Sequence, residues 1–175
     1  MTYREFNLIK ERLSKWREER HSTYENQQEA FLGNVFEKVS EYFRAKNDLE
    51  KIDALCDIVI FCFNSFDLNY SFYIEYLTEI KNPRIYNIID AVSFYSFKKY
   101  KNLAYNDTSI PLVISLCNNL VYCLGFDFYK CMLEKIKEIE SRTGYYDESL
   151  KKFIKDTSDE AKAKWYKADY ESCKL

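Results

Sequence analysis

The chain has 175 residues, a formal net charge of -2 and 31% charged residues. A nearly neutral chain lacks the positive field with which proteins collect nucleic-acid phosphates, so we expect no nucleic-acid partner. It has no run of about 18 uncharged apolar residues, and its N-terminus MTYREFNLIKERL lacks the apolar centre of a signal peptide. These features predict a single cytoplasmic domain over residues 1–175, with no contact to a membrane.

The scarcity of turn residues predicts an all-α fold. Only three Gly and two Pro occur in the whole chain, which favours long helices with short connections over a sheet. Apolar residues at helical spacing predict core helices within about residues 3–142. The helices are expected at 3–20, 25–46, 48–63, 84–100 and 112–124, with a last one running from the break GFD (125–127) to about Arg142. Residues 143–175 are expected to form an irregular tail that covers the core, with a short helix around 158–167.

Short polar segments predict how these helices connect. The break KND at 46–48, with Asp48 as N-cap of the following helix, makes its two flanking helices an antiparallel hairpin. YNDTSIP at 105–111 is expected to be a loop.

His21, the only histidine in the sequence, precedes a Ser-Thr capping signal and is expected at a helix end. A ferritin-like metal site would need two Glu-x-x-His pairs, which one histidine cannot supply.

The six cysteines are expected to be reduced and structural. They form no CxxC pair, and most lie in apolar helical segments, as buried thiols do. The residues concerned are Cys56, Cys62, Cys117, Cys123, Cys131 and Cys173.

The predicted helix hairpin concentrates acidic residues. Asp53 and Asp57 are four residues apart and share a helix face, with Glu50 one turn earlier, and Glu37 and Glu41 are also four apart on the preceding helix. Carboxylates this crowded repel one another unless a cation neutralises them, which points to Mg²⁺, or Mn²⁺ in its place. Two alternatives remain open: the three glutamates are solvated surface residues, and the buried aspartates serve structural hydrogen bonds.

The two segments that carry these acids, EKVSEYFRA and DALCDIVIF, resemble the MazG-like all-α nucleoside triphosphate pyrophosphohydrolases. The signature of that group is EExxE on one helix and ExxD on the next. Glu37 and Glu41 match the outer acids of the first element, and Asp57 matches the final Asp of the second. Lys38 stands at the position of the second Glu and Ala54 at that of the Glu in ExxD.

The C-terminal segment extends the resemblance. GFDFYKCMLEKIKEIESRTGYYDESLKKFIKDTSDEAKAKWYKADYESC is similar to the C-terminal half of phage-encoded MazG-like proteins. The resemblance implies a MazG-like helical bundle in a bacterial or phage-infected cytosol. It also implies a homo-oligomer, either a dimer or a dimer of dimers.

The resemblance further implies an activity. Such enzymes hydrolyse a (deoxy)nucleoside triphosphate to the monophosphate and pyrophosphate, for nucleotide-pool control or house-cleaning. Glu37, Glu41, Asp53 and Asp57 would be catalytic and, together with Glu50, would hold the metal ion. Lys38, Arg142, Lys152 and Lys155 would bind the substrate phosphates. The alternative is a catalytically degenerate bundle that acts as a protein-interaction module, because Lys38 and Ala54 depart from the motif.

Overall fold

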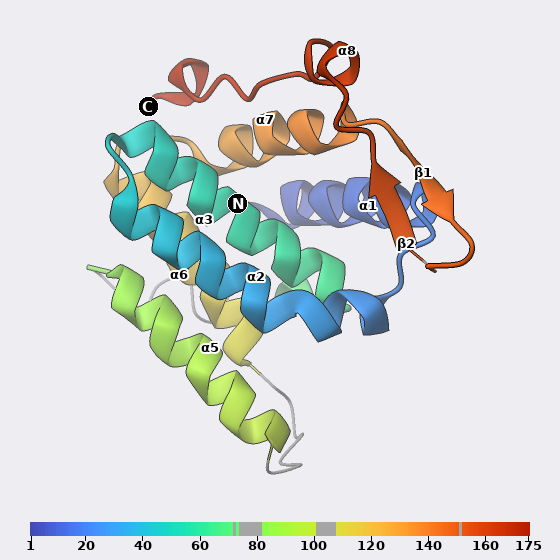
Figure 1. Cartoon of the computed structure of the whole chain (residues 1–175). Helices are drawn as coiled ribbons and strands as arrows, with labels where there is room; N and C mark the ends of the chain where they lie inside the picture. Colours follow the sequence, from blue (N-terminus) through green and yellow to red (C-terminus); the bar gives the residue numbers. More distant parts are fainter. Residues whose placement is uncertain (72, 74–81, 101–107, 151) are drawn as a thin grey trace.

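The structure is a computed structural model that describes residues 1–71, 73, 82–100, 108–150 and 152–175. The described part is mostly helical, which confirms the predicted helical class (Figure 1). Its helices are α1 (Tyr3–Glu19), α2 (Tyr24–Arg44), α3 (Asp48–Ser65), α5 (Ile85–Tyr100), α6 (Ser109–Cys123), α7 (Phe128–Glu140), α8 (Asp159–Lys162) and the 3₁₀ helix η1 (Glu171–Cys173). Two strands, β1 (Gly144–Asp147) and β2 (Lys152–Lys155), follow α7.

Most helix ends lie within a few residues of their predicted positions. The exception is α6, which begins at Ser109 with Thr108 before it, so the predicted loop at 105–111 is wrong over its last three residues. Pro111 lies in the first turn of α6, where a missing N–H removes no bond within the helix. Residues 105–107 lie outside the described part of the chain.

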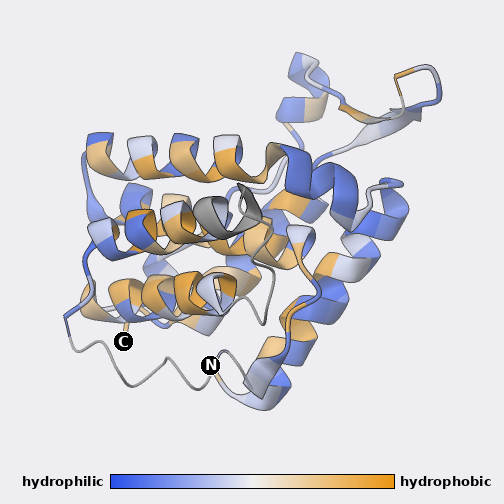
Figure 2. Ribbon diagram, turned by 90° about the horizontal axis from the view of Figure 1, so that it is seen from below, coloured by the Kyte–Doolittle hydropathy of each residue, from blue (hydrophilic) through white to orange (hydrophobic). Residues whose placement is uncertain are grey.

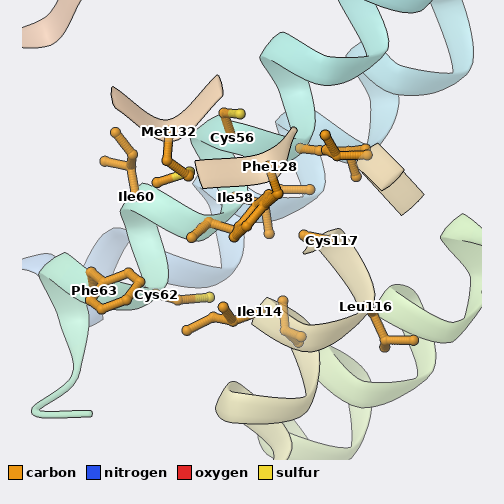
Figure 3. Close-up of a cluster of buried hydrophobic side chains, with 14 of the residues drawn as sticks. Cys56, Ile58, Ile60, Cys62, Phe63, Ile114, Leu116, Cys117, Phe128 and Met132 are labelled. Atoms are coloured by element: carbon orange, nitrogen blue, oxygen red, sulfur yellow. The ribbon is translucent and has the colours of Figure 1, made fainter. Parts of the chain in front are cut away.

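The central element is α3, which contacts α1, α2, α6 and α7. Figure 3 shows apolar side chains of α3 among those of α6 and α7. Every residue from Ala54 to Ile60 is buried, because a helix that is apolar on all sides must be surrounded by other helices. Asp57 lies within this buried segment and is therefore carried into the interior.

Helices α2 and α3 form the predicted antiparallel hairpin (Figure 1). Asn47 is the N-cap of α3, and its Oδ1 accepts a hydrogen bond from the backbone N–H of Glu50 at 2.9 Å. The prediction of Asp48 as N-cap is therefore wrong by one residue. The Glu50 carboxylate accepts from the backbone N–H of Lys46 at 2.8 Å and closes the cap in the opposite direction.

The tail is not irregular, because β1 and β2 pair as an antiparallel hairpin from Gly144 opposite Lys155 to Asp147 opposite Lys152. The expected helix at 158–167 is also shorter, since α8 covers only Asp159–Lys162. The hairpin lies beside the C-terminal end of α1 (Figure 1). There the ring of His21, which has a φ of 51° just beyond the α1 C-cap, lies 4.7 Å from that of Tyr146, in agreement with its predicted place at a helix end.

The last residues of the chain return along α7 to its beginning. The N–H of Asp127 donates to the carbonyl of Cys173 at 2.8 Å, and the N–H of Leu175 donates to that of Gly125 at 3.0 Å. Tyr170 and Cys173 are buried with the hydrophobic core. Figure 2 shows the apolar sides of the helices directed towards one another and the polar sides directed outwards.

The cysteines agree with the prediction except in one place. All six are free thiols within the described part of the chain, and each is buried apart from Cys123, which is exposed. None of the described helices is both long enough and apolar enough to cross a bilayer.

Candidate ligand cleft and its acidic cluster

Asp57 is a buried carboxylate, and the residue is 9% exposed. Each of its oxygens faces a lysine: Oδ1 lies 3.0 Å from Nζ of Lys135, and Oδ2 lies 3.2 Å from Nζ of Lys38. A buried charge is tolerated only when it is paired, so these two ammonium groups allow Asp57 to occupy an apolar helix.

Lys135 comes from α7 and was not predicted as a site residue. Its side chain is 2% exposed, and its Nζ lies 2.7 Å from Asp53 Oδ1 and 3.5 Å from Glu138 Oε1, in addition to its contact with Asp57. The sequence does contain a pattern that indicates a buried, paired lysine at this position. Lys135 lies on the buried face of α7 beside Met132 and Ile136, where a lysine requires a carboxylate opposite it.

Lys38 continues the network to α2. Its Nζ lies 2.9 Å from Glu41 Oε2 as well as contacting Asp57. Glu41, Lys38, Asp57, Lys135 and Asp53 therefore form a chain of alternating charges across α2, α3 and α7. We call these five residues together with Glu138 the acid–lysine network.

The pKa shifts of these groups fit a network in which each lysine is paired with carboxylates. Burial raises the pKa of Asp57 above its ordinary value, although Lys135 and Lys38 act in the opposite direction. Burial alone would lower the pKa of Lys135, but the carboxylates of Asp57 and Asp53 more than offset it and the pKa is raised. The pKa of Lys38 is also raised, because its bonds to Glu41 and Asp57 outweigh its burial. Both lysines are therefore charged at neutral pH.

The C-terminal tail is attached to the same network. The hydroxyl of Tyr170 donates to Asp53 Oδ1 at 2.8 Å. The same oxygen accepts from Nζ of Lys135, so it joins the tail to α7. The backbone N–H of Ala168 donates to Glu138 Oε2 at 3.2 Å. The tail thus lies over the acidic residues Asp53 and Glu138 of the helical core.

A cleft of about 920 Å³ lies between the α2–α3 hairpin, the end of α7 and the tail. This is the size of a site for a nucleotide-sized ligand. The helical core lines it with Glu41, Arg44, Asn47, Leu49, Glu50, Asp53, Glu138 and Arg142; the tail lines it with Lys162 and residues 165–171.

One wall of the cleft carries hydrogen-bond donors that lack acceptors. Nε of Arg142 and Nε1 of Trp165 are both buried and have no hydrogen-bond partner within the described part of the chain. The two side chains are adjacent, since Cζ of Arg142 lies 5.7 Å from the centroid of the Trp165 ring. Nζ of Lys155 lies 5.9 Å from the same ring. Buried donors of this kind are usually satisfied by a water molecule or by a ligand oxygen.

The predicted acidic residues do not all lie at one place. Glu41 and Asp53 line the cleft and belong to the acid–lysine network, whereas Asp57 lies behind them in the interior. Glu50 lines the cleft, but its carboxylate is used to cap α3. Glu37 is exposed on α2 and is not among the described residues that line the cleft.

The predicted phosphate-binding residues also divide. Arg142 lines the cleft, and Lys155 lies beside Trp165. Lys38 is ion-paired within the acid–lysine network. The side chain of Lys152 lies outside the described part of the structure, which places only its backbone, opposite Asp147 in the hairpin.

The predicted Mg²⁺ or Mn²⁺ centre does not fit this arrangement. Across residues 1–71, 73, 82–100, 108–150 and 152–175, no three Asp, Glu, His or Cys side chains are grouped so that they could hold a metal ion. The physical reason is that Lys38 and Lys135 already bind the oxygens of Glu41, Asp53 and Asp57 that a metal ion would need.

Comparison with protein-family models, with curated proteins and with solved structures gives no match to the chain. The resemblance to MazG-like proteins therefore stays a prediction based on sequence motifs.

Proposed function

We propose that the cleft binds a nucleoside triphosphate without a divalent metal ion, and that the chain is a catalytically degenerate MazG-like bundle that binds nucleotide and does not hydrolyse it. The observation that carries this proposal is the acid–lysine network. An acidic cleft repels a triphosphate unless its carboxylates are neutralised first. Lys38 and Lys135 place two positive charges against the four carboxylates of the network, and Arg142 pairs with one of the four, Glu138.

The remaining cationic side chains support binding of an anionic ligand. Arg44, Lys162 and Lys167 line the cleft and are exposed, so they are available to phosphate oxygens. Arg142 and Trp165 contribute the two buried donors that lack acceptors. The rings of Trp165 and Tyr166 also line the cleft and offer stacking surfaces for a base.

Calorimetric titration of the protein with nucleoside triphosphates in the presence of EDTA tests this proposal. We expect wild type to bind, and Arg142→Gln to bind at least about tenfold more weakly, a loss of about 1.4 kcal/mol. Arg12→Gln is the matched control, because Arg12 pairs with Glu140 away from the cleft. Equal affinity of wild type and Arg142→Gln would contradict the site. Failure of every nucleotide to bind would favour a protein partner.

Metal-dependent hydrolysis to the monophosphate and pyrophosphate is the second candidate. The observation in its favour is that Glu41, Glu50 and Asp53 line the same cleft as Arg142. A panel of canonical and modified ribo- and deoxyribonucleoside triphosphates with Mg²⁺, assayed for pyrophosphate release, separates the two candidates. We expect no release from wild type; sustained turnover would establish the hydrolase and overturn the binding-only proposal.

A homodimer remains part of the proposal. Large aromatic side chains are exposed on neighbouring helices: Phe36 and Phe43 on α2 and Tyr86 on α5. The rings of Phe43 and Tyr86 are 5.7 Å apart, so they form a continuous apolar surface that a second copy could cover. Light scattering coupled to size-exclusion chromatography tests it: we expect twice the mass of the chain, and a monomer would remove the dimer from the proposal.

A further inference from the structure

Two buried thiols from distant parts of the sequence meet where the tail packs on α7. Cys131 lies near the start of α7 and is 0% exposed, and Cys173 lies in η1 and is 1% exposed. The thiol of Cys131 donates to the sulfur of Cys173, whose own thiol donates to the carbonyl of Asp169 at 3.6 Å. The backbone supports the same approach, because the N–H of Asp127, one turn before Cys131, donates to the carbonyl of Cys173 at 2.8 Å. The fold thus brings the two cysteines together, as a disulfide requires.

We propose that Cys131 and Cys173 form a reversible disulfide that fastens the tail to α7 and so fixes the tail wall of the cleft. The bond would close a loop that contains the β1–β2 hairpin, α8 and residues 165–171, which line the cleft. In the reduced protein this wall is held by hydrogen bonds such as that from the Tyr170 hydroxyl to Asp53. A covalent link removes open conformations of the tail, so oxidation becomes a switch for access to the cleft.

Thiol–disulfide exchange with a low-molecular-weight disulfide, such as oxidised glutathione, forms this bond with a complete balance of atoms. The Cys173 thiolate attacks one sulfur of oxidised glutathione, releases one glutathione thiolate and leaves a mixed disulfide on the protein. The Cys131 thiolate then attacks the Cys173 sulfur and releases the second glutathione thiolate. Two protons pass from the protein thiols to the released thiolates, and two electrons pass from the cysteines to glutathione.

The reaction requires a brief opening of the tail, because burial suppresses the thiolate that attacks. Burial raises the pKa of both Cys131 and Cys173 above the ordinary thiol value. Cys173 belongs to a three-residue 3₁₀ helix that follows an irregular stretch, and such segments open locally more easily than long core helices. Opening of this segment exposes Cys173 and uncovers Cys131.

The other buried thiols provide an internal comparison. Cys56 and Cys62 lie in α3 and Cys117 lies in α6, within the helical core (Figure 3). A thiolate at Cys131 would raise the pKa of Cys56, so these two sulfurs are also near each other. If proximity alone decided oxidation, Cys56 would compete with Cys173 for Cys131. Because Cys56 lies in a long core helix that opens less easily than the tail, we expect Cys173 to be the partner.

Peptide mapping under non-reducing conditions tests the proposal on the folded wild-type protein. The protein is incubated with oxidised glutathione, its remaining thiols are alkylated, and its proteolytic peptides are identified by mass spectrometry. We expect a peptide pair joined through Cys131 and Cys173. We also expect glutathione on the exposed Cys123, which shows that the oxidant has reacted with the protein. Hydrogen exchange of residues 165–171 should slow by about tenfold or more in the oxidised protein, and the melting temperature should rise by about 5 °C or more.

Cys173→Ala should lose the cross-link and both of these changes, whereas Cys123→Ala, the matched control, should retain them. Three results would overturn the inference. The first is alkylation of both Cys131 and Cys173 after Cys123 has been fully modified by glutathione. The second is a cross-link between Cys131 and Cys56, and the third is a cross-linked protein whose residues 165–171 exchange as fast as in the reduced form. The wild-type peptide map decides the first two even if Cys173→Ala does not fold.

This inference does not depend on which ligand the cleft takes. The peptide map, the hydrogen exchange and the melts contain no nucleotide, so they can fail while nucleotide binding succeeds, and the reverse. They report on the attachment of the tail to α7, and nucleotide affinity reports on the wall formed by Arg142 and Trp165.

Discussion

Asp57 is an acidic residue in the buried segment of α3, and two lysines explain how it is accommodated. Its carboxylate is paired on both oxygens, by Lys135 from α7 and by Lys38 from α2. Burial of a carboxylate is costly, and the ion pairs with the two ammonium groups offset this cost. The same pairs remove the need for a metal ion at this position.

Replacing Asp57 by Asn should destabilise the protein. The substitution keeps the shape of the side chain but leaves two lysines with one carboxylate fewer, and breaking a buried pair costs about 3 kcal/mol. Unfolding in urea measures this loss, which should be the same with and without Mg²⁺. Asp48→Asn is the control, because Asp48 pairs with Lys51 at the surface and should lose at most about 1 kcal/mol. A rise in stability for Asp57→Asn would mean that repulsion among carboxylates dominates the cluster.

Lys135 should also make stability depend on pH in the alkaline range. Its pKa is raised above the ordinary 10.5 in the folded protein, so its stabilising contribution is complete below pH 10.5 and is lost as pH rises through the raised folded value. Melting temperatures measured from about pH 8 to about pH 12 should therefore fall more steeply in wild type than in Lys135→Met. Lys137→Met should keep the slope of wild type; identical slopes in all three proteins would show that the charge on Lys135 does not stabilise the fold.

The sequence was sufficient to bring Asp53, Asp57 and Glu41 to one region, but it did not reveal their partners, the place of Glu37 outside the cleft or the capping role of Glu50. Asp53 and Asp57 share a helix face by spacing alone, and a hairpin with a short turn brings Glu41 to the same region. Lys135 is 82 positions from Asp53 in the chain, so only the packing of α7 against α3 brings the two together. Lys38 departs from the expected motif, but the sequence does not show that its ammonium reaches Asp57.

At the scale of elements, the helices were predictable because their signals are local. Helix α1 follows apolar residues at spacings of three and four, of which Phe6, Ile9 and Leu13 are buried. The β1–β2 hairpin was missed because each strand has four residues, too few for a clear alternation of apolar and polar positions. Its stability depends on contacts with other elements, such as the 5.1 Å approach of the Arg20 guanidinium to the Phe153 ring.

Gly144 is required by the packing of this hairpin. A Cβ at this position would lie 2.2 Å from the carbonyl oxygen of Ile154 and 2.6 Å from the ring of Phe153. Gly144→Ala should therefore displace the strands and cost about 1 to 3 kcal/mol in unfolding experiments.

Gly33→Ala is the matched control for Gly144→Ala. Gly33 lies within α2, and a Cβ there would meet no described atom within 4 Å. Alanine favours a helix over glycine, so stability should rise by up to about 1 kcal/mol. Equal effects of the two substitutions would show that the close approach at Gly144 is not a constraint.

At the scale of the whole molecule, the cleft exists because the C-terminal tail folds back over the α2–α3 hairpin. The α2–α3 hairpin supplies one wall and the tail supplies the other, while Tyr170 fastens the tail to Asp53. Composition and helical spacing predict the helical class and a tail that covers the core. They do not predict the cleft, because its volume depends on how the tail folds back along α7.

The central claim is that the chain supplies its own cations, so that a nucleoside triphosphate binds without a divalent ion. Calorimetric affinity measured in EDTA and in excess Mg²⁺ tests it most directly. Mg²⁺ on the triphosphate competes with Arg142 and the exposed cations for the same phosphate oxygens, so affinity should be at least as high in EDTA as in Mg²⁺. Binding that appears only when Mg²⁺ is present would contradict the claim and return the carboxylates to the role of metal ligands.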